Sequence, residues 1–392
     1  MKESKAAIIA QALARKAIGL MAYPVFILIY LLPKRLRPTI TKINCERIGH
    51  FAGDFLIALQ EQNHSTCQQP AWHYINTRSG CCNSYLAKLA IRHLKGKHLA
   101  EAYFSGADRL PVTKHLKKDS PYDRSGSRDI TGLTQLGTVP NLFTKQEDII
   151  GSTWLAAHGY ETSMKLVLVL NRDSLYLSRI YPGQNVEHHA PRNTPIEVFE
   201  KTIRWLVNDH EDIFVIRMGK VAAEECNVKS ERFIDYPFCN ESSDFLDIWL
   251  FSKCDFFLST GSGPDIIPMY LQIPGVLADF IPLAHVPSYG RVFAAPKKIR
   301  KAKDRQLLTP AGVLRVKSSD AGYLSSSGLE AISLTPTEVL ETTKMAWDFF
   351  IEKNRYQTYI NRAGEQIYTD ELKESYPTLH GYNNPEFRLV FW

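Results

Sequence analysis

Short apolar runs alternate with amphipathic stretches along most of the chain. Lys165 to Leu170, KLVLVL, and Ile213 to Met218, IFVIRM, have the length and composition of strands that are buried on both faces. Between them, Thr194 to Asn208 carries apolar residues at helical spacing. Repeated strand–helix alternation predicts an α/β fold with parallel sheets covered by helices on both faces.

The same alternation appears in both halves of the chain. In the first half, Ile43 to Ala58 predicts a strand, a glycine-containing turn and a helix. Further strands are predicted at Trp72 to Asn76, Phe233 to Tyr236 and Phe256 to Leu258, and an apolar segment follows at Gly275 to Phe280. Further helices are predicted at Tyr85 to Leu94, Ser243 to Phe251 and Thr337 to Glu352, the last with Thr335 as its N-cap. Thr113 to Thr138 is polar and predicts a loop or an irregular insertion.

A chain of 392 residues exceeds the size of one ordinary hydrophobic core, so we expect two domains. The pattern predicts an N-terminal membrane-associating segment at 1–38 and α/β domains at 39–160 and 161–335. A C-terminal helix and tail follow at 336–392. The hydrophobic content of 44% and charged content of 22% indicate a globular chain.

The uncharged run from Ala17 to Leu32, AIGLMAYPVFILIYLL, predicts contact with a membrane. Basic residues flank it on both sides, and Pro24 lies inside it. A helix of this length rises roughly 24 Å, short of the ~30 Å hydrocarbon core. We therefore expect a peripheral or monotopic attachment, and a full span competes with it.

The net charge of +6 is modest, but the basic residues cluster between Lys297 and Arg305 and between Lys88 and Lys118. These clusters suit an anionic membrane surface or a phosphorylated acceptor, and solvated loops are the alternative. No nucleic-acid motif accompanies them, which argues against DNA or RNA as a partner. The seven cysteines lack CxxC spacing, which favours a reducing compartment.

The stretch from Cys254 to Pro274, CDFFLSTGSGPDIIPMYLQIP, reads as a strand, a glycine/serine loop and a helix. Gly261 and Gly263 allow a ligand to approach the loop backbone closely, and Ser262 adds a hydroxyl. A helix that begins after such a loop directs its N–H groups toward an anion. An ordinary strand-to-helix turn is the alternative interpretation.

Ligands of parallel sheets lie beyond the carboxyl ends of the strands, so polar residues at those positions are candidate site residues. They are Arg47, His50, Arg172, Asp173, Arg217, Asp235 and Ser262. Each has a structural alternative as well: Asp235 as a helix cap, Arg217 as the partner of a carboxylate, and His50 as a turn residue.

Several motifs occur in order from Arg47 to about Phe350. They are RIGH at Arg47 to His50, NRD at Asn171 to Asp173, HHAPRN at His188 to Asn193, VIRMG at Val215 to Gly219, IDY at Ile234 to Tyr236, DIWLFSKCDFFLSTGSG at Asp247 to Gly263 and TPTEVL at Thr335 to Leu340. This set resembles a bacterial glycosyltransferase-like family of surface-polysaccharide loci with the two-Rossmann architecture called GT-B. The GSGP loop is similar to the donor-site loop of lipopolysaccharide heptosyltransferases. Lys220 departs from the pattern, in which an acidic residue follows RMG.

The resemblance implies an acceptor domain at 39–160 and a nucleotide-sugar donor domain at 161–335. It implies metal-independent sugar transfer, without a cofactor, to a glycan or lipid-linked acceptor at the cytoplasmic face of the bacterial inner membrane. His50 is the first candidate for the general base because imidazole titrates near neutral pH, and Asp54 is the second. The candidate donor-binding residues are Arg172, Asp173, Arg192, Asn193, Arg217, Asp235, Gly261, Ser262 and Gly263.

Two other classes of function remain open at this point. One is a pyruvyl or glycerol-phosphate transferase that acts on the same polymers. The other is a non-catalytic scaffold of the assembly complex, which the change at Lys220 favours. The sequence indicates no oligomeric state.

Overall fold

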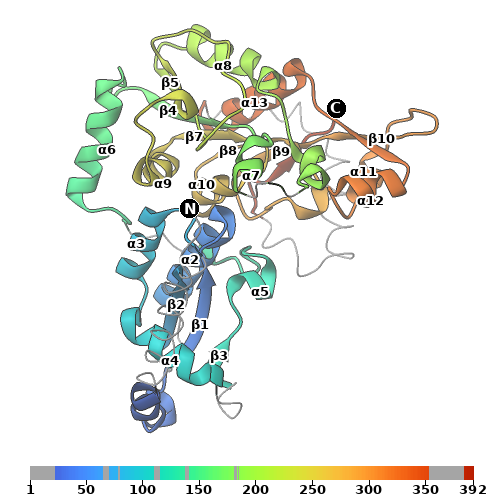
Figure 1. The fold of residues 1–392 in the computed structure, drawn as a ribbon. Coiled ribbons are helices and arrows are strands. Elements are labelled where there is room, and N and C mark those ends of the chain that lie inside the picture. The colour runs from blue at the N-terminus through green and yellow to red at the C-terminus, as the bar shows by residue number, and fades with distance from the viewer. Residues whose placement is uncertain are drawn as a thin grey trace. The chain divides into compact units, whose positions relative to one another are not determined.

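The computed structural model describes residues 23–64, 70–77, 80–109, 115–136, 141–180, 183, 185–352 and 384–392. It divides into two compact units, 1–127 and 128–392 (Figure 1). Both have the predicted α/β fold with parallel sheets. We expected the second domain to begin at 161, whereas residues 128–160 belong with the second unit.

The first unit is built on a three-stranded parallel sheet in the order β2–β1–β3. Its strands are β1 (Thr39–Asn44), β2 (Ala71–Asn76) and β3 (Lys117–Lys118). Its helices are α2 (Ile48–His64), α3 (Ser84–His93), α4 (Lys97–Arg109) and α5 (Pro121–Ser125), with a short 3-10 turn, η1 (Lys34–Leu36). The predicted strand–turn–helix unit at Ile43 to Ala58 is confirmed as β1 and α2, although β1 begins earlier, at Thr39.

The predicted membrane-associating run, Ala17 to Leu32, is described only from Tyr23 onward, and residues 1–22 lie outside the described part. Residues 23–30 are helical. Within the described ranges, no helix combines the length and apolar character that crossing a membrane requires.

The second unit contains a seven-stranded parallel sheet in the order β12–β9–β8–β7–β4–β5–β6. Its strands are β4 (Lys165–Leu170), β5 (Ile213–Arg217), β6 (Phe233–Asp235), β7 (Phe256–Ser259), β8 (Gly275–Phe280), β9 (Val292–Pro296) and β12 (Arg388–Leu389). The first strand, β4, lies in the middle of the sheet, and β5 and β6 follow on one side of it. The chain then crosses to the other side of β4, where β7, β8 and β9 follow in order. This is the Rossmann strand order with one added edge strand, and its topological switch point lies between β4 and β7.

Helices cover both faces of this sheet, as predicted. They are α6 (Lys145–Ala157), α7 (Leu175–Ile180), α8 (Glu197–Asp209), α9 (Asp244–Lys253), α10 (Ile266–Tyr270), α11 (Pro310–Leu314), α12 (Ala321–Ser326) and α13 (Pro336–Phe350). Figure 1 shows α8 and α13 on one side of the strands and α9 and α10 on the other. Thr335 caps α13 through a reciprocal pair of hydrogen bonds with Glu338, which confirms the predicted start of that helix.

The basic run after Pro296 is a strand rather than a loop. An antiparallel pair, β10 (Lys298–Lys301) and β11 (Leu329–Ile332), follows β9 directly. Four basic side chains between Lys297 and Arg305 form ion pairs: Lys297 with Asp279, Lys298 with Glu338, and Arg300 and Arg305 with Glu330. Four of the six basic residues in this predicted cationic cluster therefore have an acidic partner.

Candidate functional site

In the first unit, His50 and Asp54 lie one turn apart on α2, directly after the carboxyl end of β1. A third side chain connects them. The hydroxyl of Ser127 lies 3.2 Å from Nδ1 of His50 and donates to Oδ1 of Asp54 at 2.8 Å. The structure thus brings together the two predicted catalytic residues through a serine that the sequence analysis did not identify.

Asp54 is fully buried, and this burial raises the pKa of its carboxyl group to about 7. The hydrogen bond from Ser127 acts in the opposite direction because it favours the charged carboxylate. A carboxyl group with such a pKa changes its charge near neutral pH. It can therefore control a proton on a neighbouring group within the physiological range.

The hydrogen bonds also select the tautomer of His50. Ser127 has one hydroxyl hydrogen, and when Asp54 is ionised that hydrogen goes to the carboxylate. The Ser127 oxygen must then accept from Nδ1–H of His50. This leaves Nε2 as the ring nitrogen that carries a lone pair and can accept a proton, which is the arrangement that a general base requires.

Ser127 is held in an unusual backbone conformation, with φ of 64°. It follows Gly126, the left-handed C-cap of α5, and its N–H donates to the carbonyl of Pro121 at 3.2 Å. A non-glycine residue at positive φ costs energy and persists where its surroundings fix it, often at functional sites. The only sequence signal was its place in the polar segment Thr113 to Thr138, which we expected to be a loop.

In the second unit, the loop after β7 lies at the switch point. Gly261 has φ of 77°, and a Cβ atom there would lie 2.2 Å from Cε2 of Phe280. Its N–H donates to the hydroxyl of Ser259 at 3.2 Å, and that hydroxyl donates to the buried Asp265 at 2.7 Å. Only glycine fits this position, because the ring of Phe280 fills the space that a side chain would need. The close approach that we predicted at this glycine was that of a ligand, and that remains a prediction.

Two arginines contact this loop. Arg192, at the end of η5 (Glu187–Arg192), donates from Nη2 to the carbonyl of Gly261 at 3.1 Å. The backbone of Arg172, after β4, donates to Oγ1 of Thr260 at 3.1 Å and accepts from the N–H of Thr194 at 2.9 Å. The structure therefore brings Arg172 and Arg192 to the loop at Thr260 and Gly261, and Asn193 follows Arg192 directly in the chain.

A buried ion pair holds the segment next to Asn193. Nζ of Lys297 pairs with Asp279 and donates to the carbonyl of Asn193 at 3.1 Å, and Thr194 donates to Asp279 at 2.6 Å. Both charged side chains are almost completely buried. This support was not visible in the sequence because Lys297 appeared to belong to an exposed basic run.

The other predicted donor-binding residues make structural contacts. Both carboxylate oxygens of Asp173 accept backbone N–H groups, from Leu175 and Ala223, each at 2.9 Å. Arg217 is 1% exposed and donates to Asn171, to the carbonyl of Glu224 and to Asp235. These contacts favour the structural alternative for Arg217, as the partner of a carboxylate. Asp235 is that partner and makes no side-chain cap to the helix that follows it, and Asp173 holds two backbone N–H groups.

Two basic residues that the sequence analysis missed lie near Arg192. Burial, followed by the positive charges of Arg128 and Arg192, lowers the pKa of His285 in η8 (Leu283–His285) to about 4. Burial is the larger cause of this shift, and the positive charges of Arg128 and Arg192 act in the same direction. Neither Arg128 nor His285 follows a strand in a recognisable motif, so only the fold connects them with Arg192.

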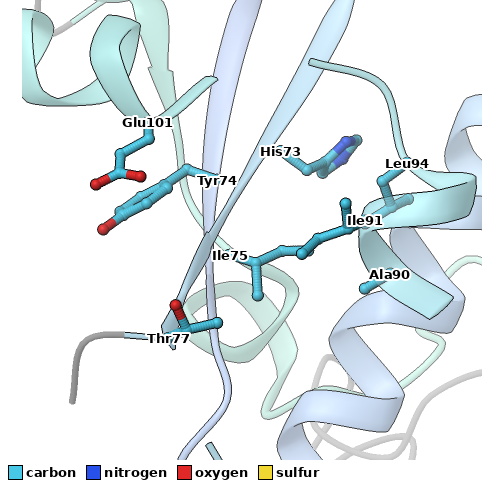
Figure 2. Close-up of a pocket in the computed structure, with 8 residues that line it drawn as sticks. All are labelled: His73, Tyr74, Ile75, Thr77, Ala90, Ile91, Leu94 and Glu101. Carbon is cyan, nitrogen blue, oxygen red and sulfur yellow. The ribbon is translucent and has the colours of Figure 1, made fainter. Parts of the chain in front are cut away.

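A separate cavity of about 180 Å³ lies in the first unit along β2. Figure 2 shows His73 and Tyr74 pointing to opposite sides of the strand, with Ile91 and Leu94 near His73 and Glu101 near Tyr74. None of the predicted site residues lines this cavity. Among the residues that the structure describes, no group of three His, Cys, Asp or Glu side chains is arranged to hold a metal ion.

Comparison with known proteins gives distant structural likeness only. No protein-family model and no curated protein matches the chain. The structure is similar to that of a family 9 glycosyl transferase from Veillonella parvula, with 9% identity, a TM-score of 0.41, and 81% of this chain and 98% of that chain covered. It is also similar to ADP-heptose LPS heptosyltransferase II from E. coli, with 10% identity, a TM-score of 0.36, and 78% and 97% covered.

Both structures carry the name of the enzyme class that the sequence motifs resemble. Because their TM-scores are low, the functional conclusion depends on the residues described above.

Proposed function

We propose that the protein is a glycosyltransferase of GT-B architecture. It transfers a sugar from a nucleotide-sugar donor to a glycan or lipid-linked acceptor in the biosynthesis of a cell-surface polysaccharide. The observation that supports this most is the switch point between β4 and β7, where Arg172, Arg192 and the Gly261–Gly263 loop meet. Open parallel sheets bind nucleotides at this position.

Sugar transfer from a nucleotide donor releases a nucleotide phosphate, whose negative charge grows as the glycosidic bond breaks. Preorganised donors lower the barrier when they point at that charge. Arg192 is fixed by its bond to Gly261, and Arg172 emerges beside the same loop. In this proposal these guanidinium groups and the loop amides stabilise the leaving phosphate without a metal ion.

The acceptor hydroxyl must lose a proton as it attacks the sugar. Nε2 of His50 takes this proton in the proposal, and Asp54 acts through Ser127 to keep the tautomer that makes Nε2 basic. Asp54 itself is fully buried, which favours a positioning role for it over direct contact with the acceptor.

Thermal unfolding of the full chain with a panel of nucleoside diphosphates and nucleotide sugars tests the donor site. A ligand at 100 times its Kd stabilises the native state by about 2.7 kcal/mol, or about 5–11 °C for a domain of this size. Arg192→Ala should abolish the shift. Arg305→Ala is the matched control because its side chain is 65% exposed and makes only a 3.8 Å ion pair.

One nucleotide should shift the parent and the control but not Arg192→Ala. If no nucleotide shifts the parent, the chain has no nucleotide donor site. An equal shift in Arg192→Ala would mean that the nucleotide binds somewhere other than at the switch-point loop. Release of nucleotide from the stabilising sugar donor in the presence of acceptor then tests transfer itself.

A further inference from the structure

The segment from Tyr23 to Leu36 is apolar on two opposite faces, and only one face is covered. Phe26 and Ile29 are 2% and 8% exposed and belong to the core cluster between β2 and α4. The ring of Phe26 stacks on Tyr103 at 5.5 Å. Gly106 makes this approach possible, because a Cβ atom there would lie 2.6 Å from Cβ of Phe26.

The opposite face consists of large apolar side chains in contact with solvent. Leu31 is 73% exposed, Leu28 is 68% exposed, and Ile27, Leu32 and Leu36 are between 39% and 51% exposed. No other stretch of similar length in the described part of the chain exposes as many large apolar residues. Because residues 27, 28, 31 and 32 recur at helical spacing, they form a single stripe, which we call the lipid face.

The charge next to the lipid face has one sign. Lys34 and Arg35 follow it in η1 and are exposed. Arg37 turns back, donates to the carbonyl of Leu32 at 3.0 Å and lies over the ring of Tyr30 at 4.2 Å. The sequence has no aspartate or glutamate between Tyr23 and Asn44. An apolar stripe with basic residues at its end is complementary to an anionic bilayer surface.

We infer that the lipid face inserts in the plane of a membrane that contains anionic phospholipid and attaches the first unit to it. The inward packing of Phe26 and Ile29 decides against a span by this segment, since a spanning helix is surrounded by lipid or by other helices. The inference does not depend on the proposed sugar transfer.

Flotation of the full chain with vesicles tests the inference. One set of vesicles contains phosphatidylcholine alone, and the other contains phosphatidylcholine with phosphatidylglycerol. We expect binding to the anionic vesicles that weakens as salt is raised. Leu28→Gln/Leu31→Gln should reduce the vesicle-bound fraction at least ~10-fold, because both side chains leave water on insertion.

Ile149→Gln/Ile150→Gln on α6 is the matched control, since these two residues are 57% and 50% exposed and lie in the other unit. The control should bind vesicles like the parent. Lys34→Gln/Arg35→Gln should keep weak binding and lose the preference for phosphatidylglycerol. Melting curves check that every variant is folded.

Four results would overturn the inference. The parent could fail to bind either vesicle, or the Leu28/Leu31 variant could bind as well as the parent, which would assign attachment to another part of the chain. Light scattering could show that this variant dissociates an oligomer while vesicle binding is unchanged, which would identify the lipid face as an interface between copies. Retention of the chain in alkaline-washed membranes would contradict in-plane attachment.

Discussion

Replacing Asp54 by asparagine removes one buried titratable group from the first unit and keeps the size of the side chain. A rise of the Asp54 pKa from 3.8 to about 7 corresponds to about 4 kcal/mol between the two protonation states. The folded state holds this proton more tightly than the unfolded chain does. The stability it contributes is therefore fully present below pH 3.8 and is lost as the pH rises through about 7.

Asparagine does not titrate, so the Asp54→Asn variant should gain stability relative to the parent as the pH rises. Between about pH 5 and about pH 8 we expect the stability of Asp54→Asn to rise by about 3 kcal/mol relative to the parent. The rise is smaller than the full ~4 kcal/mol because the parent already pays part of the cost of ionising the buried Asp54 at about pH 5. Urea titrations followed by hydrogen exchange of peptides from β1 and α2 report the free energy of unfolding of this unit. The other titrating groups are the same in both proteins, so their contributions cancel when the free energy of unfolding of the parent is subtracted from that of the variant.

Asp108→Asn is the control for this measurement. Asp108 lies in the same unit, but its side chain is 61% exposed and its ion pair with Lys117 lies at the surface, where such a pair contributes little. The control should follow the parent at every pH. A stability difference between Asp54→Asn and the parent that stays constant across this range would refute the raised pKa, and with it the neutral-pH control of the tautomer of His50.

Three further substitutions test the remaining parts of the argument. Ser127→Ala should lower the proposed transfer rate about 10- to 100-fold and change the shape of its pH–rate profile, whereas an unchanged profile would remove this serine from the proton relay. Gly261→Ala should lower the melting temperature more than Gly328→Ala, which shares a left-handed φ of 63° but faces open space, and equal losses would contradict the crowding argument. Lys297→Met should cost about 3–5 kcal/mol in unfolding free energy because it leaves the buried Asp279 unpaired, and the paired change of both to apolar residues should recover part of it. A double variant as unstable as the single one would contradict that reasoning.

The strands of the second unit could be predicted because each is an apolar run buried on both faces. β4, β5 and β8 appear in the sequence where the structure has them. β9 was missed because Val292–Pro296 is followed at once by basic residues, which made the region look solvated. The structure shows that these charges are neutralised by partners far away in the sequence, such as Glu338 for Lys298.

The candidate site was predicted less completely for a similar reason. A strand end indicates where a ligand can bind, but it does not say which way a side chain turns. Arg217 and Arg192 both belong to motifs of the resembled family, yet Arg217 lies in a buried ion pair with Asp235 and Arg192 bonds to the glycine loop. Ser127 lies 73 residues from Asp54 along the chain, and no local pattern connects them.

For the N-terminal apolar run, too, the sequence could not predict which way the side chains point. Hydropathy reports that residues near Phe26 and Leu28 are apolar, and it cannot separate those that pack on protein from those that face solvent. In the structure, Phe26 and Ile29 complete the core beside α4, while Leu28 and Leu31 point away from it. A chain shortened to Thr39 would therefore lose core packing together with its membrane contact. For this reason substitutions on the exposed face, rather than truncation, separate attachment from folding.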